Sequence, residues 1–86
     1  MSVSLTLIGK PGCHLCDDAR EVIESVIEGL PADVPRVEVS ERNILVDPAL
    51  YEKYVEEIPV VLVDGRVHTY WRVDPARLRT ALLEAR

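Results

Sequence analysis

Two cysteines near the N-terminus are the residues of this chain best suited to chemistry. They occur in Cys13-His14-Leu15-Cys16, and the sequence contains no other cysteine. A pair at this spacing can hold a metal ion, close a structural disulfide or exchange electrons as a dithiol. The choice among these three uses depends on the other available ligands and on the elements that position the pair.

The alternatives to a redox pair have little support in the sequence. Beyond the cysteines, His14 and His68 are the only soft ligands, and an adjacent Cys-His is poor spacing for one tetrahedral zinc site. A disulfide between Cys13 and Cys16 closes a very short loop and would stabilise the fold little. We therefore predict a dithiol and no bound metal. A metal or iron–sulfur carrier, or an adaptor whose cysteines are incidental, remains the non-enzymatic alternative.

Composition narrows the class of protein. With 86 residues, 48% of them hydrophobic, the chain is expected to form one small domain over residues 1–86. A net charge of −5 with scattered basic residues argues against nucleic acid or anionic lipid as a partner. No apolar run approaches the roughly 20 residues that span a bilayer, and no signal peptide is recognisable. A cytoplasmic location is expected, where cysteine pairs are seldom structural.

The segments around the pair predict different roles for the two thiols. Residues 3–8 alternate apolar and polar residues as a strand does, and an apolar helical stripe follows from Cys16 to Gly29 and Pro31. Cys13 then lies at the start of the helix, where free amide groups and the helix dipole stabilise a thiolate. Cys16 lies about one turn further in and should be more covered. We expect Cys13 to attack and Cys16 to resolve.

Charged neighbours of Cys13 act in opposite directions. Lys10 and a protonated His14 would favour the thiolate, whereas Asp17 and Asp18 would disfavour it while suiting the first turn of a helix. His14 has two interpretations. It either stabilises the thiolate and makes the disulfide more oxidising, or it points into solvent.

The remaining segments complete an α/β pattern. They are a strand at residues 36–40, a helix from Asp47-Pro48 to about Val55, a strand at 59–63, a turn at Asp64-Gly65, a strand at 66–70, and a helix from Asp74-Pro75. The predicted order is βαβαββα. One βαβ unit and one closing hairpin give a mixed four-stranded sheet flanked by helices.

A second feature lies at Glu57-Ile58-Pro59-Val60-Val61, where the third strand begins. With the cysteine pair, it makes the chain resemble the short glutaredoxin-like proteins of the thioredoxin superfamily, from about Val3 to Leu83. The matching stretches are "KPGCHLC", "ILVDPALYEKY", "EIPVVLVDG" and a final short helix. Lys10-Pro11-Gly12-Cys13 is similar to the start of the Lys-Pro-x-Cys-Pro-x-Cys stretch of glutaredoxins. Glu57-Ile58-Pro59 corresponds to a second glutaredoxin motif, Thr-Val-Pro.

The resemblance implies a thioredoxin fold and a thiol–disulfide oxidoreductase. It implies a cis Ile58–Pro59 bond beside the disulfide, with the backbone of Ile58 presented to the substrate. The residues it assigns to substrate or glutathione binding are Lys10, Gly12, His14, Leu15, Ile58 and Pro59. The implied partners are disulfide-containing proteins, with glutathione as co-substrate or a thioredoxin-reductase-type protein as electron donor. No bound cofactor is needed, and a monomer is expected.

Two departures from the family bear on glutathione. His14 stands where glutaredoxins usually carry proline, and Tyr70-Trp71-Arg72-Val73-Asp74 stands where a Gly-Gly-Asp motif helps to bind glutathione. A glutathione-independent, thioredoxin-like reductase is therefore the enzymatic alternative. Trp71 itself either walls the substrate groove or packs over the hairpin, and we favour packing.

Overall fold

Four strands form one mixed sheet in the computed structural model, which describes residues 2–85. The strands are β1 (Ser2–Gly9), β2 (Arg36–Asn43), β3 (Val60–Val63) and β4 (Arg66–Tyr70), in the spatial order β2-β1-β3-β4. β1 is parallel to β2 and antiparallel to β3, and β3 is antiparallel to β4. The predicted parallel pair and closing hairpin are both confirmed.

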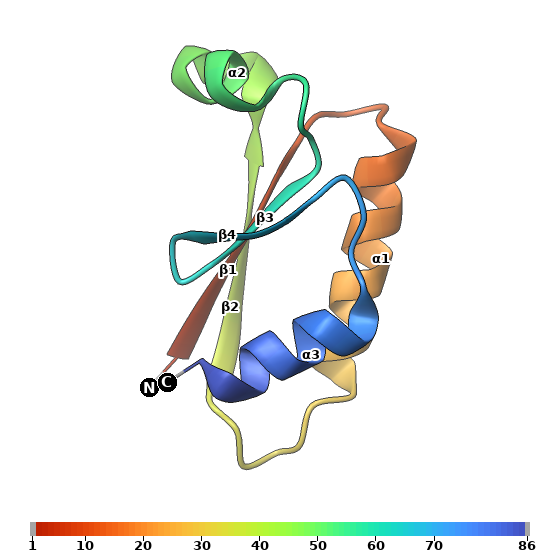
Figure 1. The fold of residues 1–86 in the computed structure, drawn as a ribbon, viewed down its shortest axis with the longest axis vertical. Helices are drawn as coiled ribbons and strands as arrows, with labels where there is room; N and C mark the ends of the chain where they lie inside the picture. The colour runs from red at the N-terminus through yellow and green to blue at the C-terminus, as the bar shows by residue number, and fades with distance from the viewer. Residues whose placement is uncertain (1, 86) are drawn as a thin grey trace.

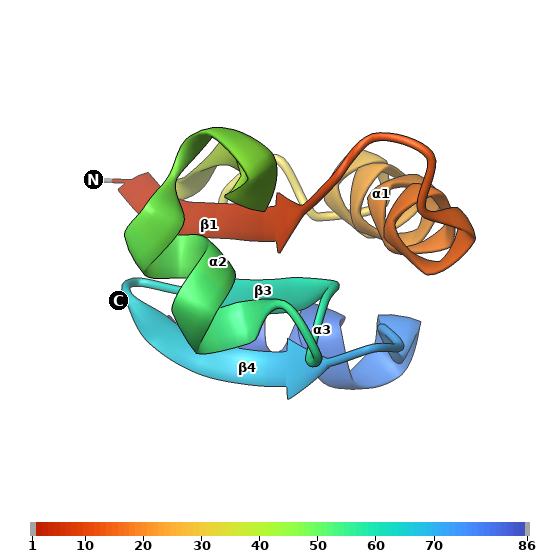
Figure 2. The ribbon, with the colours of Figure 1, turned by 90° about the horizontal axis from the view of Figure 1, so that it is seen from above.

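Helices lie on both sides of this sheet. They are α1 (His14–Glu28), a 3₁₀ turn η1 (Ile44–Val46), α2 (Pro48–Tyr54) and α3 (Pro75–Glu84). Figures 1 and 2 show α1 and α3 together on one side, with α2 on the other, beyond the end of β2. The order βαβαββα is confirmed, with η1 as an addition.

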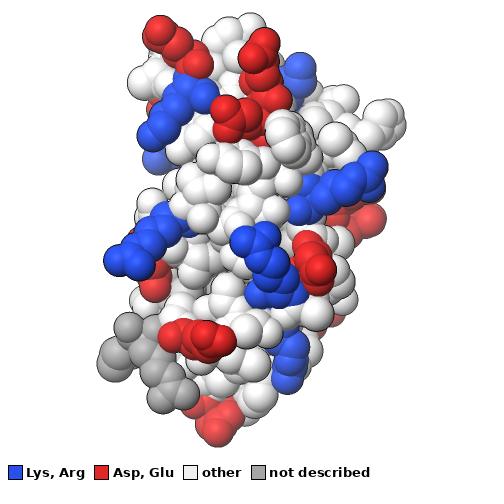
Figure 3. All heavy atoms as spheres, viewed as in Figure 1, with Lys and Arg blue, Asp and Glu red and all other residues white. Residues whose placement is uncertain are grey.

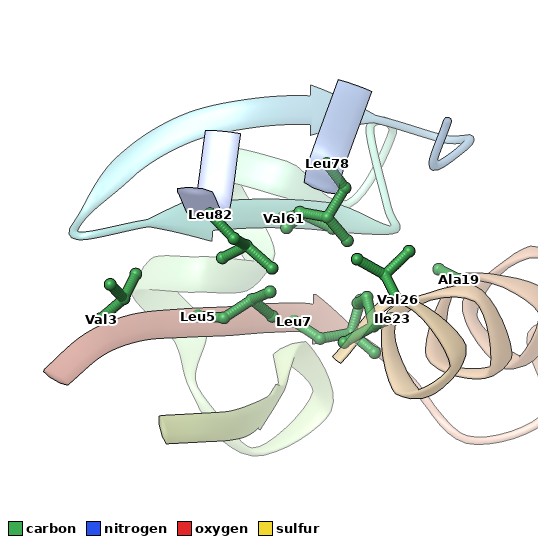
Figure 4. Close-up of a cluster of buried hydrophobic side chains, with 9 residues drawn as sticks. All are labelled: Val3, Leu5, Leu7, Ala19, Ile23, Val26, Val61, Leu78 and Leu82. Carbon is green, nitrogen blue, oxygen red and sulfur yellow. The ribbon is translucent and has the colours of Figure 1, made fainter. Parts of the chain in front are cut away.

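The alternating residues of β1 divide the core into two clusters. Val3, Leu5 and Leu7 point toward α1 and α3 and are at most 2% exposed. Figure 4 shows them packed against the helices within the first cluster, which comprises Val3, Leu5, Leu7, Ala19, Ile23, Val26, Val61, Leu78 and Leu82. The second cluster, on the α2 side, comprises Ile8, Cys16, Ile44, Tyr54, Ile58 and Val60. Cys16 therefore lies in the core at the carboxyl end of β1.

Local side-chain contacts explain where α2 and α3 begin. Asp47 accepts a hydrogen bond from the Leu50 amide at 3.2 Å, and Asp74 accepts one from the Arg77 amide at 3.1 Å. Each aspartate precedes a proline at the first helical position, as the sequence predicted.

β2 differs from the prediction in length. It continues past residue 40 to Asn43, because it pairs with β1 from Ser2↔Arg36 to Gly9↔Asn43. Pairing with a buried central strand thus extends a polar segment that has little strand propensity of its own. The Asn43 side chain then accepts a hydrogen bond from the Leu45 amide at 2.8 Å and starts η1, which the sequence did not predict.

Charges of both signs are mixed on the surface shown in Figure 3, and that face carries no patch of a single sign among the described residues. None of the helices between residues 2 and 85 has the length and apolar character needed to cross a membrane.

Candidate active site

Cys13 is the N-cap residue of α1. Its backbone is extended (φ −95°, ψ 114°), and its Sγ atom accepts a hydrogen bond from the Cys16 amide at 3.3 Å. A sulfur atom therefore takes the place of the usual capping oxygen, at the positive end of the helix dipole. Cys13 is half-buried, in contrast to the core position of Cys16. This position suits a thiolate nucleophile.

Cys16 has the opposite environment. It is 1% exposed, and burial is the main reason that its pKa rises from 9.0 to about 11. A hydrogen bond to the Cys13 side chain and the negative charges of Cys13 and Asp17 raise this pKa further, while the backbone of Lys10 opposes them. Cys16 is thus a protonated thiol at neutral pH, and both cysteines are free in this structure.

Gly9 contacts the buried cysteine, and sequence reasoning missed it. A Cβ atom at this position would lie 2.7 Å from Sγ and 3.2 Å from Cβ of Cys16. Any larger residue would therefore displace the thiol or helix α1. The available signal was a glycine directly after a buried strand and close to the cysteines, a setting in which glycine often marks a close approach.

The segment before β3 joins the same site. The Ile58–Pro59 peptide bond is cis, as the resemblance implied, and both residues are buried. Ile58 belongs to the second core cluster together with Cys16, and Cys13 packs against that cluster. The structure thus brings together Cys13, Cys16 and Ile58, which are far apart in the sequence.

The other predicted binding residues lie around the two cysteines, and Lys10 and Leu15 line separate cavities. Lys10 is exposed and lines a cavity of about 270 Å³ beside Cys16. Arg20 also lines this cavity and is held there by Glu41 at 2.8 Å and Asp17 at 2.9 Å.

Gly12 and His14 are both exposed, which fits the solvent-facing interpretation of the histidine. Leu15 is half-buried and lines a separate cavity of about 190 Å³ with Trp71. Trp71 is 52% exposed, with its ring centre 6.0 Å from that of Tyr70 in the hairpin. It therefore lines the cavity beside Leu15 and also contacts Tyr70 of the hairpin. Within residues 2–85, no group of three or more His, Cys, Asp or Glu is placed to hold a metal ion.

Comparison with known proteins places this geometry in a family. The profile described as "Glutaredoxin-like domain (DUF836)" matches residues 4–83. "Uncharacterized protein Rv0508" of Mycobacterium tuberculosis is 34% identical over 73 residues, which cover 85% of this chain and 75% of the relative. "Glutaredoxin-like protein YDR286C homolog" of Dictyostelium discoideum is 25% identical over 81 residues, covering 90% and 72%.

Solved structures agree with this placement. The X-ray structure of target protein XcR50 from X. campestris has a TM-score of 0.74 and 32% identity, covering 95% of this chain and 99% of that one. A mutant thioredoxin from Halobacterium salinarum has a TM-score of 0.62 at 21% identity, covering 98% and 77%, and shows the fold alone. The predicted thioredoxin fold is confirmed, and the cysteine pair within it suggests a redox function. The chain belongs to the glutaredoxin-like domain family.

Proposed function

We propose that this protein reduces disulfides by dithiol exchange, with Cys13 as nucleophile and Cys16 as resolving thiol. One observation carries the proposal: the Cys13 sulfur caps α1 and accepts a hydrogen bond from the amide of Cys16, a cysteine that is itself buried in the core. The two sulfurs therefore have the unequal environments that the two steps of exchange require.

In the first step, the Cys13 thiolate attacks one sulfur of a substrate disulfide. A new S–S bond joins Cys13 to that sulfur, the substrate S–S bond breaks, and the other substrate sulfur leaves as a thiolate that takes a proton from water. Ile58, which packs in the same cluster as the cysteines, supplies backbone groups to an extended substrate. Lys10, Gly12, His14, Leu15 and Pro59 complete the proposed binding surface.

In the second step, Cys16 loses its proton to solvent and attacks the Cys13 sulfur. The product is an oxidised Cys13–Cys16 disulfide and a reduced substrate thiolate, so two electrons have passed to the substrate. Two of the interactions that raise the Cys16 pKa come from Cys13, namely its hydrogen bond and its charge. In a mixed disulfide the Cys13 sulfur is uncharged and a weaker hydrogen-bond acceptor, so formation of that intermediate makes Cys16 easier to deprotonate.

Glutathione or a reductase protein then returns the pair to the dithiol form, and no bound cofactor takes part. A reducing cytoplasm would keep the protein ready for another cycle. Glutathione-independent reduction is the second candidate. It is supported by Trp71 and Arg72, which follow β4 and stand where glutaredoxins carry the glycines of their glutathione-binding Gly-Gly-Asp motif.

Mass spectrometry of three proteins tests the proposal. Reduced wild type, Cys13→Ser and Cys16→Ser are each mixed with oxidised glutathione and, separately, with insulin as a protein disulfide. Wild type should end as the intramolecular disulfide, Cys16→Ser should hold a mixed disulfide at Cys13, and Cys13→Ser should fail to reduce either substrate. Reduction by Cys13→Ser at the wild-type rate would contradict the mechanism. An insulin adduct without a glutathione adduct would favour the glutathione-independent candidate.

A further inference from the structure

Trp71 has a backbone conformation that is unusual for a large side chain. Its φ is 63°, and the amide of Arg72 donates to the carbonyl of Tyr70 across it at 2.7 Å. This is a γ-turn of the positive-φ kind, which is rare and strained. Glycine adopts such a φ without steric cost, whereas a bulky residue does not. The presence of tryptophan at this turn therefore calls for an explanation in terms of its side chain.

Two hydrogen bonds fix Trp71 to the segment before β3. Its amide donates to the Pro59 carbonyl at 2.7 Å, and its indole Nε1 donates to the Glu56 carbonyl at 3.2 Å. The acceptors flank Ile58, the residue proposed to present backbone groups to the substrate. The indole is thus held in a defined position beside the site, yet 52% of the residue remains exposed. A fixed and exposed tryptophan has the properties of a binding surface, because its large ring loses little freedom on contact.

Trp71 also lines a cavity together with Leu15 of the cysteine motif. The segment between β4 and α3 passes beside α1 (Figure 1). Residues of these two segments line a cavity of about 190 Å³. Most of its lining is apolar, with Asp18 and Arg72 as the charged exceptions; the apolar residues are Leu15, Ala19, Val22, Trp71 and Val73. The volume lies below the roughly 300–1,000 Å³ of small-molecule pockets. It suits a single apolar side chain of a larger ligand.

The position of Leu15 links this cavity to the chemistry. Leu15 lies between Cys13 and Cys16 in sequence, so the cavity opens within two residues of the proposed nucleophile. A disulfide bound at Cys13 would therefore place residues next to its own cysteine at the start of α1, where Leu15 lines this cavity.

Resting on the oxidoreductase function proposed above, we propose that Trp71 is a specificity-determining residue. It selects extended protein segments that carry an apolar side chain next to the disulfide cysteine, and this side chain enters the cavity between Trp71 and Leu15. The chemical step is unchanged: the Cys13 thiolate attacks the substrate disulfide and releases the second sulfur.

Trp71 is the only tryptophan in the chain, so its fluorescence reports directly on this contact. Two peptides that differ only in Leu or Ser beside their cysteine are activated as thiopyridyl disulfides. Each is then coupled to Cys13 of the Cys16→Ser variant, with release of thiopyridine. We expect the Leu peptide to shift the emission to shorter wavelength relative to the Ser peptide. Equal emission maxima in two adducts confirmed by mass would overturn the role of Trp71. Failure of both peptides to form an adduct at Cys13 would instead overturn the proposed function, and the role of Trp71 with it.

Rate constants give a second, independent measurement. The second-order rate constants of the reduced protein with the two peptide disulfides define a Leu-to-Ser ratio. Trp71→Gly should lower this ratio at least about tenfold, as removal of a binding hot spot does, while glycine accepts the positive φ and protects the fold. Trp71→Phe should retain part of the preference. The matched control is Val67→Ala, an exposed apolar residue at the hairpin end of β4, which should keep the wild-type ratio. An equal loss for both peptides in Trp71→Gly would show that Trp71 is only structural.

Discussion

Single residues at the start of α1 make the two cysteines chemically different. Cys13 caps the helix with its sulfur, while Cys16, one turn later, is buried in the core. Burial is the larger cause of the raised Cys16 pKa, and Cys13 adds to it. Substitution of either Gly9 or Cys13 should therefore change the surroundings of the Cys16 thiol.

Gly9→Ala should destabilise the protein by about 1–3 kcal/mol, the usual cost of forcing an extra group into a packed core. The added Cβ would lie 2.7 Å from the Cys16 sulfur. Denaturant unfolding of the reduced protein, alone and in a Cys16→Ala background, measures the coupling between the two positions. The penalty should shrink in that background, because the sulfur is gone.

Gly29→Ala is the matched control for this cycle. The nearest atoms to an added Cβ there lie at 3.6 Å, an ordinary contact, and φ is −86°. This substitution should cause no loss of stability. Equal penalties for Gly9→Ala with and without the Cys16 sulfur would show that the close approach is unimportant.

Replacing Cys13 by alanine should lower the pKa of Cys16. The hydrogen bond and the charge contributed by Cys13 disappear, whereas burial, the largest cause, remains. The pKa should therefore fall below about 11 and stay above 9.0. An NMR titration of the Cys16 Cβ shift in both reduced proteins measures the change. A Cys16 pKa that stays the same or rises in the variant would contradict the proposed coupling between the thiols.

At the scale of elements, the cap of α2 and a buried histidine in β4 both bear on stability. Asp47 begins α2, whose Tyr54 packs in the same cluster as Cys16. His68 lies in β4 where the pairing with β3 is irregular, between Val61↔Thr69 and Leu62↔Val67. Substitution of either residue should therefore change stability measurably.

Asp47→Ala should lower the free energy of unfolding by about 1 kcal/mol, through loss of the helix cap. Asp47→Asn keeps an oxygen for the Leu50 amide but loses the ion pair with Arg42 at 3.3 Å and the negative charge at the start of α2. Because Arg42 is 57% exposed, that pair is worth about 0–1 kcal/mol. Chemical denaturation should rank wild type, Asn and Ala in that order. An asparagine variant as unstable as the alanine variant would assign the effect to the ion pair and that charge.

His68 should make stability depend on pH. Its Nε2 atom is buried without a hydrogen-bond partner among the described residues, and burial followed by the charge of Arg77 lowers its pKa below 6.5. The folded state thus binds this proton more weakly than the unfolded state. The resulting stability is fully present above pH 6.5 and is lost as pH falls through the folded pKa.

Unfolding measurements between about pH 7 and pH 5, the range around the ordinary histidine pKa, test this dependence. His68→Gln should flatten the decline in stability. His14→Gln, at the exposed histidine, should retain the wild-type slope. A slope that responds to His14 and not to His68 would contradict the assignment.

Most of the helices, strands and turns could be predicted from the sequence, because the signals that mark them are local. Aspartate before proline begins α2 and α3, and the Asp64-Gly65 turn has positive φ at both residues, as a type I′ hairpin turn requires. The extension of β2 depends on its register with β1, and the Gly9 contact depends on how α1 packs. The turn at Trp71 depends on hydrogen bonds to Glu56 and Pro59. These features come from contacts between distant segments, which a pattern along the chain does not encode.

At the scale of the whole molecule, the fold brings a strand end, a helix start and the Ile58–Pro59 segment to one place. The second core cluster joins them, and Cys13 packs at its edge. The protein is thus organised around one pair of unequal thiols. We propose that this pair cycles between dithiol and disulfide.

Equilibration in a series of glutathione buffers tests that claim most directly, with free thiols trapped by alkylation and counted by mass spectrometry. We predict one two-electron transition from the dithiol to an intramolecular Cys13–Cys16 disulfide. Its potential should lie between about −270 mV and −200 mV, the range from thioredoxin to the glutaredoxins. A pair that remains a dithiol in every buffer, or that forms only glutathione adducts, would contradict the account.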